Sequence, residues 1–119
     1  MVPLILDAVL GENAWLSRSR AIELLSANAA RLFGLDRKGS LAVGYDADIL
    51  AIDPTARHIL SASDLHDAAG YSPYEGKRLR GSITDVWRRG SRVISDGVAN
   101  HSGGGIFVPK SPTTGPTHV

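Results

Sequence analysis

The sequence predicts an α+β fold in which helices occupy the first third of the chain and antiparallel strands follow. Up to residue 36, apolar residues recur every three or four positions, which is the period of an amphipathic helix. From Gly39 onward, short apolar runs are separated by turns that contain glycine, aspartate or proline, which is typical of strands. Helices and strands that are segregated along the chain favour α+β over an alternating α/β arrangement.

The first two helices are predicted from residue spacing and from their starts. Residues 3–10 are apolar at helical spacing, and Pro3 suits a first helical turn because its missing N–H costs nothing there. A second helix is predicted over residues 18–25, with Ser17 or Ser19 as the N-cap. We expect the first of these helices to be mostly buried.

A third, shorter helix is predicted over residues 29–33. Residues 26–28 are interpreted as a break, after which the side-chain oxygen of Asn28 can cap the new helix. Gly34 follows at the C′ position, where the left-handed backbone favours glycine. The helical part of the chain should end there.

The clearest strand is residues 49–52, an unbroken apolar run of the kind that is buried on both faces of a sheet. We expect this strand to be entered through a tight turn at residues 44–48 and to end at Asp53-Pro54. Residues 41–43 and 57–61 are predicted to be two further extended pieces.

A β-hairpin is predicted to close the sheet. Residues 80–88 form its first strand, Gly90-Ser91 its turn and residues 93–94 its return strand. Asp96-Gly97 turns the chain again. Beyond residue 102 the composition is rich in glycine, proline, serine and threonine, and we expect residues 110–119 to be a disordered tail.

Composition is that of a globular chain with one modest core, because 119 residues bury little surface. The net charge of +1 gives no reason to expect a nucleic-acid or membrane partner, and the N-terminus lacks the basic region of a signal peptide. The absence of cysteine rules out disulfides and thiolate zinc sites and fits a cytoplasmic location. A group of late basic residues is interpreted as a solvated strand face rather than an anion site: Lys77, Arg78, Arg80, Arg88, Arg89 and Arg92.

Four histidines are the candidate metal ligands, His58, His66, His101 and His118. None of the pairs has the His-x-His or His-x3-His spacing that lets two imidazoles face one metal ion. His66 is the best placed, although a hydrogen-bonded structural histidine is the favoured interpretation. A small independent enzyme built on His58 and His66 stays open as a hypothesis.

Two aspartates, Asp46 and Asp48, flank the turn before the predicted buried strand. Paired carboxylates can bind calcium or act as acid and base, but aspartates in such a turn usually accept hydrogen bonds from neighbouring backbone N–H groups. Asp53 and Glu75 are interpreted in the same structural way. We therefore assign no catalytic, substrate-binding or metal-binding residue to this chain.

Five stretches, taken in order, resemble one enzyme family, the metal-dependent cyclic amidohydrolases that include dihydropyrimidinase, hydantoinase, allantoinase and dihydroorotase. The resemblance is to the C-terminal part of these enzymes. Ser72 stands where asparagine is usual in them. The stretches are LLSANAARLFGL (24–35), KGSLAVGYDADILAIDP (38–54), GYSPYEGKRLRG (70–81), VWRRGSRVISDG (86–97) and GGGIFVPK (103–110).

The resemblance implies three parts of the chain. Residues 1–36 would be terminal helices of a TIM-type barrel, residues 37–101 part of a small antiparallel β-sandwich, and residues 102–119 a C-terminal arm and disordered tail. It also implies that full-length members hold a divalent metal, zinc in a binuclear site, through barrel residues that precede the matched region. No such ligand can be assigned to a residue of this chain, so we expect no cofactor to be bound here.

By the same resemblance, the parent enzyme would hydrolyse C–N bonds in cyclic amides and be dihydropyrimidinase- or hydantoinase-like, with an allantoinase-like enzyme as second choice. We expect the 119 residues alone to be inactive, to associate with the barrel portion or with copies of themselves, and to dissolve poorly. The alternative is a non-catalytic assembly module that docks on a separate barrel subunit or on itself.

Overall fold

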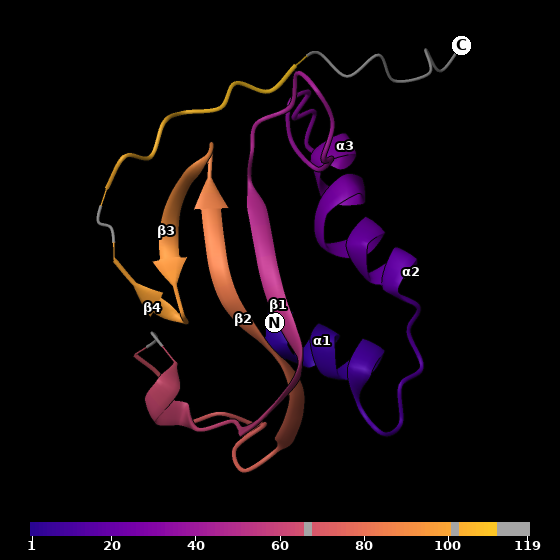
Figure 1. Ribbon diagram of the computed structural model, residues 1–119, viewed down its shortest axis with the longest axis vertical. Helices are drawn as coiled ribbons and strands as arrows, with labels where there is room; N and C mark the ends of the chain where they lie inside the picture. Colours follow the sequence, from indigo (N-terminus) through magenta and orange to yellow (C-terminus); the bar gives the residue numbers. More distant parts are fainter. Residues whose placement is uncertain (66–67, 101–102, 112–119) are drawn as a thin grey trace.

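The computed structural model describes residues 1–65, 68–100 and 103–111. The helices α1 to α3 and η1, residues 2–32, form a helical unit that lies beside one antiparallel sheet (Figure 1). The strands pair in the order β1-β2-β3-β4, each antiparallel to the next. This arrangement confirms the α+β prediction. The helices are α1 (Val2–Leu10), α2 (Arg18–Ile22), the π-helical η1 (Glu23–Ala27) and α3 (Asn28–Leu32). The strands are β1 (Ile49–Ile59), β2 (Arg78–Arg88), β3 (Ser91–Ser95) and β4 (Val98–Ala99), with the short 3-10 helix η2 (Ala62–Asp64) after β1.

Helix α1 forms where the apolar spacing predicts it and packs on β2. Leu6 is buried in this contact. Strand β2 admits the helix at Gly81, where an added Cβ would lie 2.8 Å from Leu10 Cδ1 and 3.4 Å from Leu6 Cβ. Gly81 also has a φ of +88°, a conformation that other residues rarely adopt. Glycine is therefore required twice at this position, by the backbone and by the helix above it.

The predicted break at residues 26–28 is wrong. Helix α2, η1 and α3 follow one another without interruption, and Asn28 has helical dihedral angles of φ −68° and ψ −39°. The Asn28 side chain accepts a hydrogen bond from Arg31 at 2.8 Å instead of capping a new helix. Instead of a break, the helix widens locally into the π-helical segment η1 and continues into α3.

Both ends of this composite helix match the predicted signals. Ser17 is the N-cap, because its Oγ accepts a hydrogen bond from the Arg20 N–H at 3.2 Å. Ser19, the other candidate, lies inside α2. Gly34 follows α3 with a φ of +65°, as expected at a C′ position.

Strand β1 does not end at Asp53-Pro54 as predicted but continues to Ile59. Its pairing with β2 is interrupted between Asp53 and Arg57, where the register shifts. Within this bulge, Asp53 Oδ1 accepts hydrogen bonds from the Thr55 N–H at 2.8 Å and from the Thr55 hydroxyl at 2.7 Å. Proline is tolerated because bulges and edge strands need no ladder donor at every position.

The prediction that residues 49–52 are buried on both faces is also wrong for this structure. Leu50 retains 40% of its surface, and Ile49 and Ile52 are similarly exposed. Side chains of a strand point to the two faces of the sheet, and among the described residues no helix packs extensively on β1, so these side chains stay partly exposed. Residues 41–43, predicted as extended, form bends and turns, with Leu41 and Val43 exposed.

The hairpin prediction is confirmed. Both residues of each connecting turn have positive φ, with 47° and 79° at Arg89-Gly90 and 51° and 77° at Asp96-Gly97. Two such residues in succession match the twist of antiparallel strands, which is why this turn type dominates tight hairpins. Ser91, predicted to belong to the turn, is the first residue of β3.

The buried core of the described residues is small, as the chain length predicts. It comprises four apolar residues, Leu6, Ala21, Ala30 and Leu79. Many larger apolar side chains are exposed, on the helical unit, on β1 and on residues 103–111. Among the described residues, no helix is both long and apolar enough to cross a membrane.

The C-terminal segment is partly ordered against the fold. Ser111, predicted to lie in a disordered tail, donates from its N–H to the Gly34 carbonyl at 2.9 Å. Figure 1 shows residues 103–111 as a yellow trace that crosses above the sheet to the end of α3. The rest of the predicted tail, residues 112–119, lies outside the described residues.

Candidate functional site

Of the four candidate histidines, only His58 lies among the described residues; His66, His101 and His118 fall outside them. His58 is on β1 opposite Leu79 of β2, and its Nδ1 atom is inaccessible to solvent and finds no hydrogen-bond partner among the described residues. The hypothesis of a shared site on His58 and His66 therefore stays a hypothesis.

The described residues do not fit a metal ion. Across residues 1–65, 68–100 and 103–111, no three side chains of histidine, cysteine, aspartate or glutamate come together in a way that could hold one. Asp46 and Asp48 lie close together, but the cations that neutralise them are side chains of this chain. No catalytic step is therefore derived through a metal on these residues.

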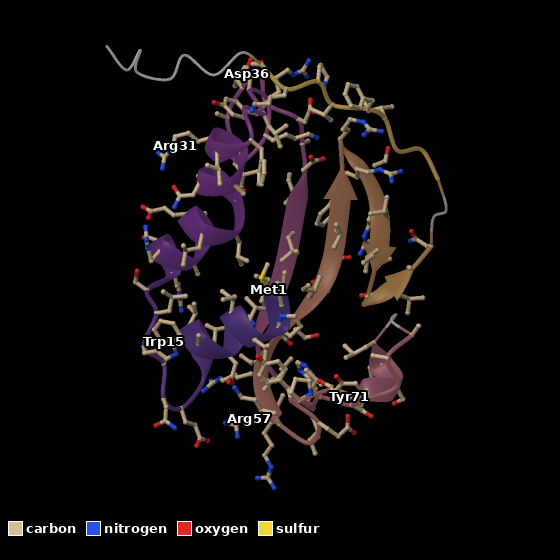
Figure 2. All side chains as sticks on the ribbon, turned by 180° about the vertical axis from the view of Figure 1, so that it is seen from behind. Met1, Trp15, Arg31, Asp36, Arg57 and Tyr71 are labelled. Carbon is tan, nitrogen blue, oxygen red and sulfur yellow. The ribbon has the colours of Figure 1, made fainter. Side chains whose placement is uncertain are left out.

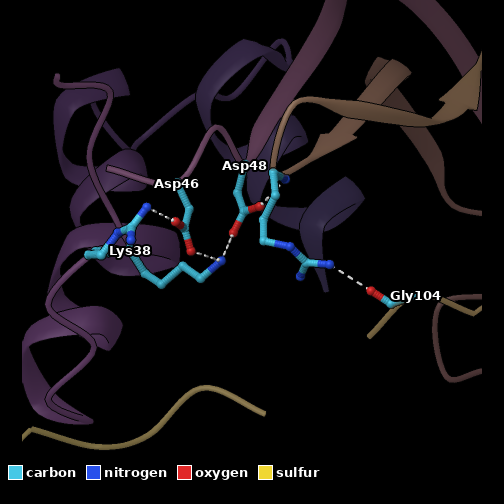
Figure 3. Close-up of polar contacts among 6 residues, drawn as sticks. Lys38, Asp46, Asp48 and Gly104 are labelled. Atoms are coloured by element: carbon cyan, nitrogen blue, oxygen red, sulfur yellow. Dashed lines mark hydrogen bonds and ion pairs between the residues drawn. The ribbon is translucent and has the colours of Figure 1, made fainter. Parts of the chain in front are cut away.

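The most elaborate polar site is the joint between the helical unit and the sheet, which we define as residues 37–48. Its centre is the Lys38 ammonium group, which lies 2.9 Å from Asp46 Oδ2 and also contacts Asp48 Oδ2 (Figure 3). Arg37 pairs with the second oxygen of Asp46 at 2.8 Å. Two anions are thus balanced by two cations drawn from the same short segment.

The joint also binds the β2–β3 hairpin directly. Asp48 Oδ1 accepts a hydrogen bond from the Arg89 N–H at 2.8 Å. The neighbouring Ala47 carbonyl accepts one from the Gly90 N–H at 2.9 Å. Because Arg89 and Gly90 form the tight turn of the hairpin, the joint fixes the position of that turn relative to the helical unit.

The pKa values of the joint move in the directions that these contacts require. The hydrogen bonds that Lys38 donates to Asp48 and Asp46 raise the pKa of Lys38 above its ordinary value of 10.5. The Lys38 hydrogen bond lowers the pKa of Asp46 below 3.8. At Asp48, partial burial opposes ionisation, but the hydrogen bonds from Lys38 and the Arg89 N–H outweigh it and the pKa is lowered. All three groups are therefore held in their charged forms.

An open hollow of about 800 Å³ lies between α1, β1 and the start of β2. Asp7 of α1 projects there and accepts a hydrogen bond from the Arg80 N–H at 3.1 Å, while its other oxygen lies 3.6 Å from Lys77 Nζ. Its carboxylate is therefore occupied by backbone and ion-pair contacts. His58 also lines the space, but its unpartnered Nδ1 has no hydrogen-bonded base or nucleophile beside it.

The loop after β1 is held by Glu75, in agreement with its structural interpretation. Its carboxylate accepts hydrogen bonds from the Ala62 N–H at 2.5 Å and from the Ser61 hydroxyl at 3.2 Å. Tyr71, on the same connection, lies with Arg57 at the end of the sheet opposite Asp36 (Figure 2). This loop is thus organised by its own polar contacts.

The interpretation of the late basic residues as a solvated face holds in part, because Lys77, Arg78 and Arg92 are exposed. Some of the arginines also make specific contacts. Arg92 pairs with Asp85 through its Nε at 2.8 Å and lies 5.8 Å from the centre of the Trp87 ring. Arg88 and Arg89 donate to the carbonyls of Gly103 and Gly104 at 2.5 and 2.6 Å.

Sequence reasoning missed the cations of the joint and the role of Arg89. Lys38 was missed because a lysine that lies ten residues before its aspartate partner gives no periodic signal. The Arg89 contact joins residues 41 positions apart and depends on the hairpin being in place. One signal was available, because two aspartates close together in one turn favour a nearby cation, and Arg37 and Lys38 lie in the same segment.

Comparison with known proteins extends the similarity over nearly the whole chain. The family model described as "Amidohydrolase family" matches residues 3–93. A D-hydantoinase from Streptomyces coelicolor is 39% identical over 98 residues, which are 81% of this chain and 21% of that protein. A D-phenylhydantoinase from Escherichia coli O1:K1 / APEC is 41% identical over 103 residues, 85% of this chain and 22% of that protein.

Solved structures agree with these sequence matches. A D-hydantoinase (dihydropyrimidinase) from Thermus sp. superimposes with a TM-score of 0.78 at 33% identity, over 85% of this chain and 22% of that one. An L-hydantoinase (dihydropyrimidinase) from Arthrobacter aurescens gives a TM-score of 0.76 at 31% identity, over 84% and 22%. The chain spans about a fifth of the length of the relatives that it matches.

Proposed function

Because this chain belongs to the amidohydrolase family, we propose that it is the C-terminal portion of an enzyme that hydrolyses a C–N bond in a cyclic amide. The substrate class is that of hydantoins and dihydropyrimidines, after the names of the relatives. One observation carries the proposal: more than four-fifths of the chain matches these enzymes, but only about a fifth of each enzyme is matched.

We propose a structural role for this portion within that enzyme. The joint fixes the hairpin turn against the helical unit through Lys38, Asp48 and Arg89, and its ionisable groups are occupied by one another. The described residues offer no metal constellation and no nucleophile beside a base, so the groups that bind the metal and activate water would belong to the remainder of the enzyme.

The same proposal accounts for the exposed apolar surface. In the complete enzyme, the helical unit would be the end of a barrel, and the sheet would be part of a small β-sandwich. The outer edge of β1 and exposed residues such as Ile22 and Phe33 would then be covered by the remainder. Expressed alone, the 119 residues would leave an unpaired edge and apolar side chains in water, which promotes association.

A chimaera tests the structural role. Residues 3–100 of this chain replace the matching segment of the Streptomyces coelicolor D-hydantoinase, and hydrolysis of a 5-substituted hydantoin is measured. We expect activity in the chimaera and none in the 119-residue chain alone. A matched chimaera that carries Asp48→Asn should keep its KM while losing thermal stability. Hydrolysis by the isolated chain that His58→Ala abolishes would overturn the proposal.

The size of the native polypeptide gives a second test. An antibody raised against residues 44–54 is used to detect the protein in its source cells. A TIM-type barrel adds roughly 250 residues, so a band far above 12.6 kDa is expected. A band at 12.6 kDa would contradict the proposal and would favour the second candidate, an assembly module that docks on a separate barrel subunit or on itself.

The exposed edge of β1 is the observation that favours this second candidate, because an unpaired strand can accept a strand from another chain. Co-purification of the tagged chain with a stoichiometric barrel protein would support it. A single longer polypeptide in the source cells would rule it out.

A further inference from the structure

We propose that residues 103–111 form a clasp whose two ends bind cooperatively. Binding of one end to the sheet promotes binding of the other end to the helical unit. The segment passes from the hairpin side of the sheet to the end of α3 (Figure 1). It therefore bridges two units that are otherwise linked at this end by the joint.

The first end of the clasp is held by two adjacent arginines. Arg88 Nη2 donates to the Gly103 carbonyl at 2.5 Å. Arg89 Nη2 donates to the Gly104 carbonyl at 2.6 Å (Figure 3). The backbone N–H of Arg89 is bound at the same time by Asp48. The arginine that holds the clasp is thus itself fixed by the joint.

The second end is seated at the C-terminus of the helical unit. The Ser111 N–H donates to the Gly34 carbonyl at 2.9 Å, and the Ser111 hydroxyl donates to the Asp36 carboxylate. Gly34 is shaped for this contact, since an added Cβ would lie 2.9 Å from the Ser111 carbonyl oxygen and 3.2 Å from Lys110 Cγ. Figure 2 labels Asp36 where the trace reaches this end.

The middle of the clasp is unsupported. Among the described residues, 105–110 find no backbone hydrogen-bond partner, and Ile106 and Phe107 expose 62% and 88% of their surface. A segment held only at its ends obeys the rule for two linked binding sites. When one end is bound, the other is kept at high effective concentration, and releasing either end weakens both.

Ser111 also lines an open hollow of about 370 Å³ beside the joint, together with Ala30 of α3, Gly34, and Lys38 and Tyr45 of the joint. Opening the clasp would remove Ser111 from this lining. The clasp thus links the hairpin turn to one wall of a hollow on the helical unit.

A disulfide tests the coupling, because the native chain contains no cysteine. Asp36→Cys and Ser111→Cys are introduced together into the full chain, and disulfide formation with oxidised glutathione is timed by non-reducing gel and mass spectrometry. The proposal predicts a fast intrachain disulfide. Adding Arg88→Ala and Arg89→Ala, which act only on the far end, should slow it at least about fivefold.

Matched controls separate coupling from general loosening. Arg92→Ala removes another guanidinium of the same hairpin, one that binds Asp85 rather than the clasp, and should leave the rate unchanged. Gly34→Ala should slow the reaction, whereas Gly76→Ala, with a similar φ but nothing within 4 Å of the added Cβ, should not. Equal rates with and without Arg88 and Arg89, no disulfide at all, or a disulfide between two chains would each overturn the proposal.

Discussion

The two ends of β1 are fastened to the helical unit by different forces. At the Ile49 end, the joint uses ion pairs and hydrogen bonds on partly exposed side chains. At the Ile59 end, Leu79 and Gly81 of the partner strand receive α1 through apolar contact, and Leu79 is only 2% exposed. The comparison separates an electrostatic fastening, which responds to pH and salt, from a packing fastening, which responds to side-chain volume.

The largest effect is expected at the packing end. Leu79→Ala removes the most buried side chain of the described core, and the cavity should cost about 2–5 kcal/mol of unfolding free energy. Urea unfolding at fixed protein concentration measures it. Leu41→Ala is the matched control, since Leu41 is exposed and its loss should change stability little. Equal effects of the two substitutions would contradict the assignment of the core.

Acid should release the electrostatic end first. The folded-state pKa values of Asp46 and Asp48 are lowered, so their stabilisation is present above about 3.8 and is lost as pH falls through the lower, folded values. Lys38 has the opposite sign: its raised pKa stabilises below about 10.5 and the contribution is lost as pH rises through the folded value. The protection of the Gly90 amide against hydrogen exchange, taken relative to its intrinsic exchange rate at each pH, should therefore fall at both extremes of pH.

Constant protection of the Gly90 amide down to pH 2 would show that the joint carries no pH-dependent stability. Arg80 is left out of the comparison because its N–H donates to the Asp7 carboxylate. The amides of Arg78 and Leu79, which lie opposite Ile59 and His58 of β1, provide the internal comparison, because none of the three ionisable groups of the joint lies beside them. Their protection should fall only with global unfolding.

Asp48→Asn should have a smaller effect at neutral pH. The asparagine oxygen can still accept from the Arg89 N–H, but the charge opposite Lys38 is lost, at a cost of about 0.5–1 kcal/mol for a partly exposed ion pair. Chemical unfolding at pH 7 gives the value. Glu12→Gln removes the charge of a carboxylate outside the joint and should change the unfolding free energy little. A greater loss in Glu12→Gln would place the electrostatic fastening elsewhere.

Salt should give the smallest change. At 1 M ionic strength the screening length falls to about 3 Å, which weakens the exposed ion pairs of the joint but leaves apolar packing intact. The destabilisation caused by Asp48→Asn should therefore shrink in high salt, whereas that caused by Leu79→Ala should not. Measuring the unfolding free energy of both variants at low and high salt tests the two expectations.

The features that sequence could predict are those decided by a few neighbouring residues. Ser17 and Gly34 delimit the composite helix, and Asp96-Gly97 makes the turn between β3 and β4, because each acts through its own backbone or side chain. The family resemblance was likewise carried by short local motifs, and the comparisons confirm it.

The features that failed depend on distant partners. Whether β1 ends at Pro54 is decided by β2, which offers pairing for residues 57–59 and keeps the strand extended beyond the bulge. The burial predicted for residues 49–52 requires layers that cover both faces of β1, which the described residues do not provide. The joint was missed because its key contact joins Asp48 to a residue that only the folded hairpin brings near.

The π-helical segment η1 has a consequence for the angular phase of the helix that follows it. A π turn spans one more residue than an α turn, so every later residue lags by about 100° around the axis relative to an unbroken α-helix. In that phase Ala30 lies against Gly39 of the joint, where an added Cβ would come within 2.6 Å of the Ala30 Cβ. If the same residues formed a regular α-helix, Ala30 would rotate away from Gly39, whereas deleting one residue between Glu23 and Ala27 would make the helix regular and leave Ala30 in place.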